Sequence, residues 1–173
     1  MLVVKKSYNK RVAPFSTESQ TNLTIIPVNV KVTMVLMNIL DIQEVKHIII
    51  LKFGIMLEWY EKRAIYHNLK QEETLNTLTE SEINQLWTPY VIYENTDKND
   101  AVTLGEVATS LTVTREGNFT RSDITVTDEI EIFRGNENKL TMNQTDSKQF
   151  HCIYQLQTYP FDTQVIGNIF FLV

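Results

Sequence analysis

The stretch "VNVKVTMVLMNILDIQEVKHIIILKFGIMLEW", residues 28–59, decides the expected fold. The apolar residues Val28, Val30, Val32, Met34 and Leu36 alternate with Asn29, Lys31 and Thr33, which is the period of a strand with one buried face. A polar turn is expected over residues 41–47. Beyond it, every odd position from Ile49 to Trp59 is apolar, whereas the even positions are mixed. A helix over 47–59 is the alternative, but the β-branched and aromatic content favours a second strand with its odd face in the core.

The rest of the chain continues this pattern of short strands and turns. Strands are expected over residues 91–93 and 110–114, with a hairpin turn at "REGN" (115–118) and another turn at "RGNEN" (134–138). A capping-box pattern at residues 79–82 predicts a short helix near 80–86. The spacing predicts an all-β fold, an antiparallel β-sandwich of immunoglobulin-like type. Residues 1–27 are expected to be irregular, and residues 28–173 to form the domain.

Composition narrows the classes of partner and compartment. The 173 residues carry a net charge of −5, with no run of Lys and Arg, which argues against nucleic acid as a partner. The most apolar stretch, residues 47–57, contains Lys52 and is too short to span a bilayer. A single cysteine fits a reducing compartment. Three glycosylation sequons, at Asn22, Asn118 and Asn143, fit the secretory pathway instead.

No pattern of catalytic or metal-binding residues stands out. The three histidines, His47, His67 and His151, are far apart and none has a second ligand at helical spacing. Neither a glycine-rich phosphate loop nor a G-x-S-x-G elbow occurs, and His151 on a strand would point away from Cys152. We therefore expect no enzyme activity, no metal and no cofactor.

Two aromatic residues near a polar loop suggest binding. Trp87 and Tyr93 flank Pro89, and aromatic side chains near a loop can cage a cationic ligand. For Trp87 the favoured interpretation is a hydrophobic anchor. For Tyr93 and its neighbour Glu94, anchor and ligand contact both remain open.

Several segments, in order along the chain, resemble the extracellular ligand-binding domain of Cys-loop receptors, the pentameric ligand-gated ion channels. They are "YNKRVAP" (8–14), "EW" (58–59), "LWTPYVIYEN" (86–95) and the signature loop that runs from Cys152 through "YPFD" (159–162). The resemblance covers most of residues 8–164 and is nicotinic acetylcholine receptor-like. It implies a β-sandwich in a ring of five subunits on the extracellular side of the plasma membrane. A small neurotransmitter-like agonist would bind between neighbouring subunits, and contact with the membrane would come only through a channel domain.

The resemblance also implies roles for particular residues. Tyr93 and Glu94 fall in the first loop of the principal face. Gly54 stands where nicotinic members carry an aromatic on the complementary face, with Phe53 toward the core. The residues expected to couple agonist binding to the pore are Glu44 and Val45 in the first turn, and Tyr159, Pro160, Phe161 and Asp162 in the signature loop.

The sequence departs from the family pattern at three places. Gly54 replaces the aromatic, Tyr90 replaces the Asp that follows the proline, and Ile166 stands where the partner of Cys152 is implied. The resemblance ends after Gln164, so we expect a fragment that leaves the true coding sequence at about residue 165, through a frameshift or a mis-joined exon that affects residues 166–173. Two alternatives to a channel subunit are a soluble secreted binding protein of the same fold, acetylcholine-binding protein-like, and an unrelated β-sandwich interaction module.

Overall fold

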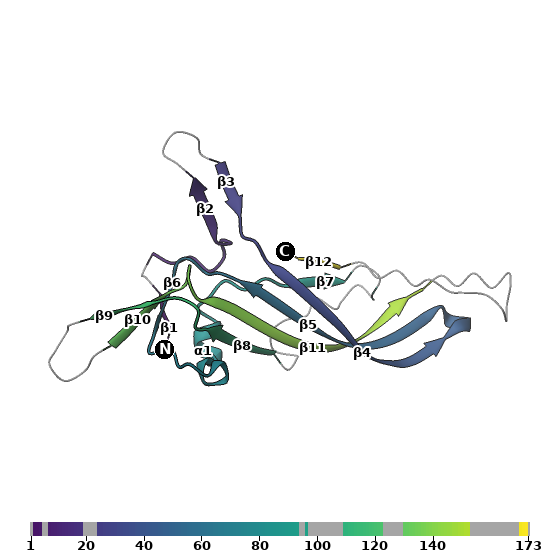
Figure 1. Cartoon of the computed structure of the whole chain (residues 1–173). Helices are drawn as coiled ribbons and strands as arrows, with labels where there is room; N and C mark the ends of the chain where they lie inside the picture. The colour runs from purple at the N-terminus through teal and green to yellow at the C-terminus, as the bar shows by residue number, and fades with distance from the viewer. Residues whose placement is uncertain are drawn as a thin grey trace. The chain divides into compact units, whose positions relative to one another are not determined.

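The computed structural model describes residues 2–4, 7–18, 24–93, 96, 109–122, 130–152 and 170–172, and almost all of its regular structure is strand (Figure 1). The strands are β1 (Leu2–Val4), β2 (Phe15–Glu18), β3 (Thr24–Pro27), β4 (Lys31–Gln43), β5 (Ile48–Trp59), β6 (Ala64–His67), β7 (Val91–Tyr93), β8 (Thr109–Thr114), β9 (Phe119–Ser122), β10 (Ile130–Arg134), β11 (Lys139–His151) and β12 (Phe170–Leu172). The helical elements are η1 (Glu44–Lys46), η2 (Glu73–Asn76) and α1 (Glu80–Ile83). The expected all-β sandwich with a short helix is confirmed.

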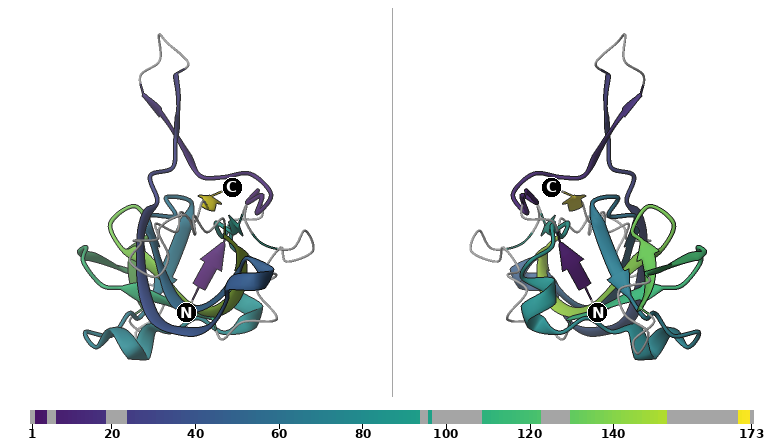
Figure 2. Two further views of the ribbon diagram at one scale, coloured as in Figure 1. Left: turned by 90° about the vertical axis from the view of Figure 1, so that its right-hand side faces the viewer. Right: turned by 90° about the vertical axis from the view of Figure 1, so that its left-hand side faces the viewer.

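Two four-stranded sheets make up the sandwich. One has the strand order β1-β6-β10-β9 and the other the order β4-β5-β11-β8. In the first sheet the neighbouring strands run antiparallel, with Val3 opposite Ile65 and Phe133 opposite Tyr66. Two smaller antiparallel pairs are β12-β7 and β2-β3, and the second of these forms a ribbon (Figure 2). Segment 1–27, expected to be irregular, thus contains three short strands.

The chain divides into two compact units. The first comprises residues 1–32, 56–88 and 110–143, and the second comprises residues 33–55, 89–109 and 144–173. The core of the first unit takes buried side chains from both sheets. Its largest members are Trp59, Tyr66, Phe133, Leu57, Leu69, Leu111, Leu140 and Met142.

The core of the second unit is built on β5. Ile49, Leu51, Phe53 and Ile55 are buried, which confirms the predicted odd face of this strand. The Phe53 ring lies 5.6 Å from that of Tyr93 and 6.0 Å from that of Phe150, centroid to centroid. The contact between Phe53 and Tyr93 is edge-on, a geometry that adds to the stabilisation that comes from burial alone.

The prediction for the strand before β5 is wrong in two respects. β4 begins at Lys31 and continues to Gln43, so the turn is confined to η1 and His47, which adopts a left-handed conformation with φ 56°. None of the residues of β4 is buried, although a buried face was expected. Because β4 ends the strand order of its sheet, it has one neighbouring strand among the described residues instead of two.

The predicted hairpin at residues 115–118 is also wrong. β8 and β9, which flank this turn, belong to different sheets. The turn at 134–138 likewise joins β10 of one sheet to β11 of the other. The composition of a turn predicts that the chain reverses there. It does not predict whether the next strand pairs with the preceding strand or joins the other sheet.

Glu58 lies on the even face of β5, which was expected to be mixed, yet its side chain is almost completely buried. Its side chain is 9% exposed and lies between the ammonium groups of Lys31 at 2.7 Å and Lys139 at 2.8 Å. Hydrogen bonds from Lys139 and then Lys31 lower the pKa of Glu58. A carboxylate in this position is tolerated because two cations compensate its charge.

The predicted capping box is confirmed. The backbone N–H of Thr79 donates to Glu82 Oε2 at 2.9 Å, and the backbone N–H of Leu2 donates to Glu82 Oε1 at 2.8 Å. Burial raises the pKa of Glu82, but these two bonds and the Thr79 hydroxyl outweigh it and lower the pKa to about 2. The carboxylate therefore fixes the N-terminus of α1 to strand β1.

This network predicts a pH dependence of stability. Because the pKa of Glu82 in the folded state lies below its ordinary value of 4.5, its contribution is complete above pH 4.5 and is lost as the pH falls towards about 2. Glu82→Gln should flatten the decline of the melting temperature across this range, as followed by circular dichroism. Glu80→Gln, on the same exposed turn, should retain the wild-type slope; identical slopes for all three proteins would contradict the assignment.

Candidate functional site

Five of the residues predicted to bind agonist, to couple binding to the pore or to form the signature loop are described by the structure, and all five belong to the second unit. These are Gly54, Tyr93, Glu44, Val45 and Cys152. The predictions for Asn22, Glu94, Tyr159, Pro160, Phe161, Asp162 and Ile166 lie outside the described residues.

Tyr93 is placed in the core of the second unit. It is 6% exposed, and its ring also lies 6.1 Å from the ring of Phe150. Its hydroxyl has no hydrogen-bond partner among the described residues; burial raises the pKa of this phenol, and the negative charge of Asp146 raises it further. The ammonium of Lys148 lies 6.0 Å from the ring centroid. The ring is thus a hydrophobic anchor with one cation at its face.

Gly54 lies on the face of β5 opposite to Phe53, because successive side chains of a strand alternate. A Cβ atom at this position would lie 3.0 Å from Met37 Cε and 3.9 Å from the carbonyl oxygen of Gln144. Met37, which is 54% exposed, therefore borders the space where the resemblance places an aromatic ring. Since Tyr93 packs on Phe53, the structure does not bring Tyr93 and Gly54 into one pocket.

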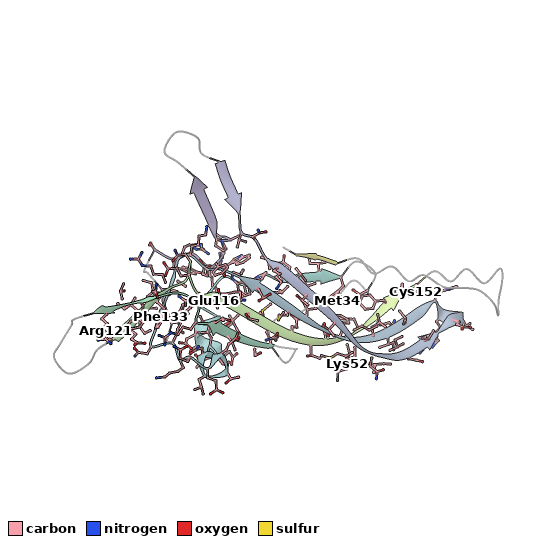
Figure 3. All side chains as sticks on the ribbon, in the orientation of Figure 1. Met34, Lys52, Glu116, Arg121, Phe133 and Cys152 are labelled. Atoms are coloured by element: carbon pink, nitrogen blue, oxygen red, sulfur yellow. The ribbon has the colours of Figure 1, made fainter. Side chains whose placement is uncertain are left out.

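The turn between β4 and β5 presents an apolar side chain at its tip. Val45 is 96% exposed and Glu44 is also exposed. Just past the end of β11 (Figure 3), the backbone N–H of Cys152 donates to the carbonyl oxygen of His47 at 2.8 Å. Cys152 is buried and His151 exposed, so the two point to opposite faces as predicted. This hydrogen bond joins the first turn to the start of the signature stretch.

Sequence reasoning missed a buried polar network in the first unit. Glu61 is completely buried, and its carboxylate accepts hydrogen bonds from Arg63 Nε and Nη2, each at 2.8 Å, and from the Tyr8 hydroxyl at 2.9 Å. The Tyr8 oxygen in turn accepts a hydrogen bond from the backbone N–H of Trp87 at 2.8 Å. Burial raises the pKa of Tyr8.

This network explains why three of the quoted segments occur together. Tyr8 comes from "YNKRVAP", Glu61 follows "EW" by two residues, and Trp87 comes from "LWTP". The Trp87 ring also meets the Trp59 ring edge-on at 6.2 Å, which confirms its interpretation as an anchor. These segments are therefore a scaffold, and the only sequence signal for Glu61 was its position beside a buried tryptophan.

Other predicted features are placed without being tested. Asn118 and Asn143 are exposed, as a glycan would require. Within the described ranges, no group of three or more His, Cys, Asp and Glu side chains is arranged to hold a metal ion. Of the helices in the part of the chain that the structure describes, none has the length and apolar character needed to cross a membrane.

The fold is thus an all-β sandwich in which a hydrogen bond joins the first turn to the start of the signature stretch. The sequence model of the family described as the neurotransmitter-gated ion-channel ligand binding domain matches residues 2–165. The chain belongs to this family, which is not a family of enzymes. No curated protein matches the chain. The family match sets aside the alternative of an unrelated β-sandwich module, and its end at residue 165 lies one residue past the end of the resemblance.

Proposed function

We propose that this chain is the ligand-binding portion of a neurotransmitter-gated channel subunit on the extracellular side of the plasma membrane. Agonist would bind at interfaces in a pentamer, and the first turn and the signature loop would pass the resulting change to the pore. Family membership supports the receptor function. The hydrogen bond between the Cys152 N–H and the His47 carbonyl, at 2.8 Å, carries the coupling part of the proposal.

The tip of the first turn has the properties expected of a coupling element. Val45 is almost fully exposed, and Leu40 and Ile42, shortly before it in the chain, are about half exposed, so this end of the hairpin leaves several apolar side chains in water, which is unfavourable. His47 holds a left-handed conformation that costs roughly 1–3 kcal/mol and must be maintained by its surroundings. A displacement of the signature stretch would pull directly on this turn through the Cys152 bond. Such coupling needs contacts that differ between the resting and the open state.

The face of β5 that carries Gly54 is our candidate for the complementary side of the interface. Val35, Met37 and Ile39 of β4 alternate onto the face where Met37 meets Gly54, and all three are about half exposed. This face offers apolar contact and no aromatic ring at Gly54. Recognition of a cationic agonist would therefore depend on the principal face of the neighbouring subunit. We assign Glu94 to that face, with the buried Tyr93 as the anchor of the same loop.

The coupling proposal predicts that Val45→Asp separates gating from binding. In the complete subunit, expressed in a cell membrane, the substitution should raise the agonist concentration for half-maximal current at least tenfold, because a charged tip loses its apolar contact. Displacement of a radioligand by a competitive antagonist, which does not favour the open state, should be unchanged. Val45→Ile, which keeps the apolar tip, should behave like the wild type.

Two results would count against the proposal. Equal shifts in current and in displacement would place Val45 in the binding site rather than in coupling. A complete transcript that, beyond Gln164, lacks four apolar segments of about twenty residues would favour a soluble binding protein of the same fold.

A further inference from the structure

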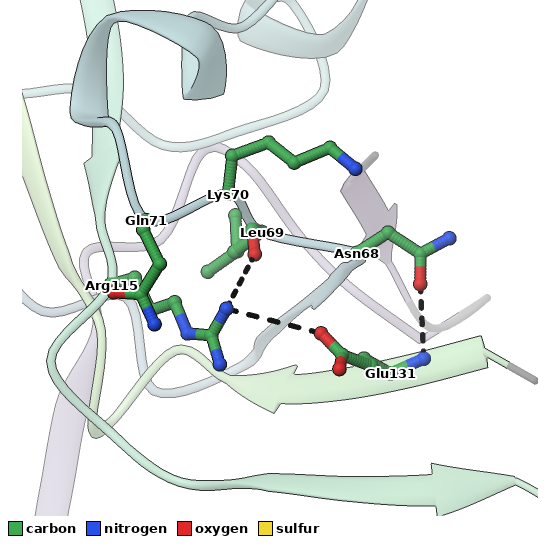
Figure 4. A pocket seen from close by; sticks show the side chains of 6 residues that line it. All are labelled: Asn68, Leu69, Lys70, Gln71, Arg115 and Glu131. Carbon is green, nitrogen blue, oxygen red and sulfur yellow. Dashed lines mark hydrogen bonds and ion pairs between the residues drawn. The ribbon is translucent and has the colours of Figure 1, made fainter.

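A pocket in the first unit lies among residues that the proposed receptor function does not use. It has a volume of about 490 Å³ and is lined by Asn68, Leu69, Lys70, Gln71, Arg115 and Glu131 (Figure 4). Small-molecule sites in proteins typically have volumes of about 300–1,000 Å³. Its lining contains two cations, one carboxylate and two amides, which together suit a small charged molecule.

Arg115 is held in a fixed orientation in this pocket. Its guanidinium lies 4.8 Å from the ring centroid of Phe133 and 5.5 Å from that of Phe119, and its Nη1 donates to the carbonyl oxygen of Leu69 at 3.1 Å. A guanidinium has five N–H donors, and among the described residues only Nη1 makes a hydrogen bond. The remaining donors form a planar edge suited to a carboxylate.

The loop that forms the rim is held in place before any ligand arrives. Asn76 is completely buried; its Oδ1 accepts from the Lys70 N–H at 2.8 Å and its Nδ2 donates to the Lys70 carbonyl at 2.9 Å. Asn68 adopts a left-handed conformation, φ 55°, and exchanges hydrogen bonds with the backbone of Glu131 at 2.9 and 3.0 Å. A rim fixed in this way loses little conformational entropy on binding.

The charges favour a ligand that carries both signs. Glu131 Oε2 lies 4.0 Å from Arg115 Nη1, and the two side chains are 32% and 20% exposed, so both face solvent through the opening. A simple anion would be attracted by Arg115 and Lys70 but repelled by Glu131. A zwitterion would place its carboxylate on the guanidinium edge and its ammonium on the Glu131 carboxylate.

We propose that this pocket binds a small zwitterion of the α-amino acid class, with Arg115 as the carboxylate contact and Glu131 as the ammonium contact. The site is separate from the interface agonist site of the proposed function, and it does not depend on that function.

Titration of the full chain with glycine, acetate and methylamine, followed by the NMR amide signals of Lys70 and Glu131, tests the proposal. Glycine should saturate with a dissociation constant on the order of 1 mM, near the lower end of useful affinities. Acetate and methylamine should each bind at least tenfold more weakly. Equal binding of glycine and acetate would overturn the assignment of a zwitterion site.

Substitutions distinguish a ligand-binding role of Arg115 and Glu131 from a purely structural ion pair between them. Arg115→Lys keeps the charge but loses the planar fork, and should weaken glycine binding at least tenfold; Arg134→Lys, at an exposed arginine outside the pocket, should leave it unchanged. Glu131→Gln, at a part-exposed side chain that the fold should tolerate, should abolish the preference for glycine over acetate. Absence of saturable glycine shifts in the wild type, or glycine binding unaffected by both pocket substitutions, would disprove the proposal.

Discussion

Gly135→Ala is expected to lower the free energy of unfolding by about 3 kcal/mol, at the upper end of the usual cost of overpacking. A Cβ at residue 135 would overlap the carbonyl oxygen of Glu61 and lie 3.0 Å from that of Ala64. Both obstacles are backbone atoms and cannot rotate away. The Gly135 N–H also donates to the Ala64 carbonyl at 3.0 Å, so moving the two segments apart would break this bond.

Urea denaturation followed by tryptophan fluorescence measures the loss. Gly54→Ala is the matched control, because the nearest atom to its added Cβ is the end of the flexible Met37 side chain at 3.0 Å. This control should change stability by no more than about 0.5 kcal/mol. Equal losses in the two variants would mean that the close approach at Gly135 does not constrain the fold.

Glu61→Ala is expected to cost about 3 kcal/mol. Removing one member of a buried ion pair typically costs 3–5 kcal/mol, and the lower value applies here because the Arg63 side chain is 28% exposed and can regain water. The substitution also leaves the Tyr8 hydroxyl without its acceptor, at a point where Tyr8 holds the backbone of Trp87. The substitution should therefore also weaken the packing where the segments that contain Tyr8, Glu61 and Trp87 meet.

Glu61→Gln tests whether the carboxylate or only its volume matters. The amide keeps one acceptor oxygen but loses the charge, so it should recover roughly half of the stability. Glu44→Gln, at an exposed position, should be neutral within about 0.5 kcal/mol. A Glu61→Ala protein as stable as this control, or one with an unchanged near-ultraviolet tryptophan signal, would rule out the network as a structural support.

Much of the fold was predictable because its signals are local. Alternation along β5 separates the buried Phe53 from the part-exposed Gly54 without reference to any other strand. The capping box joins Thr79 to Glu82, only three residues further along the chain, and it is present in the structure. The family match over residues 2–165 includes all the segments on which the resemblance was recognised, from residues 8–14 to residues 159–162.

The candidate site was predictable only in part. Val45 is exposed and Gly54 is part-exposed beside Met37, whereas Tyr93 is packed between Phe53 and Phe150. The pocket around Arg115 had no signal in the sequence, because the loop at 68–71 reaches it from a distant part of the chain.

The sequence by itself determined the family, the all-β class and the inward face of β5, since these depend on spacing along one strand or one motif. Only the tertiary structure decided which strands share a sheet, why β4 lacks a buried face, and that Tyr8, Glu61 and Trp87 meet in one network. The physical reason is that a turn such as 115–118 reverses the chain without specifying its next partner. Strand pairing and burial depend on contacts between residues that are far apart in the chain. Such contacts leave no local pattern in the sequence.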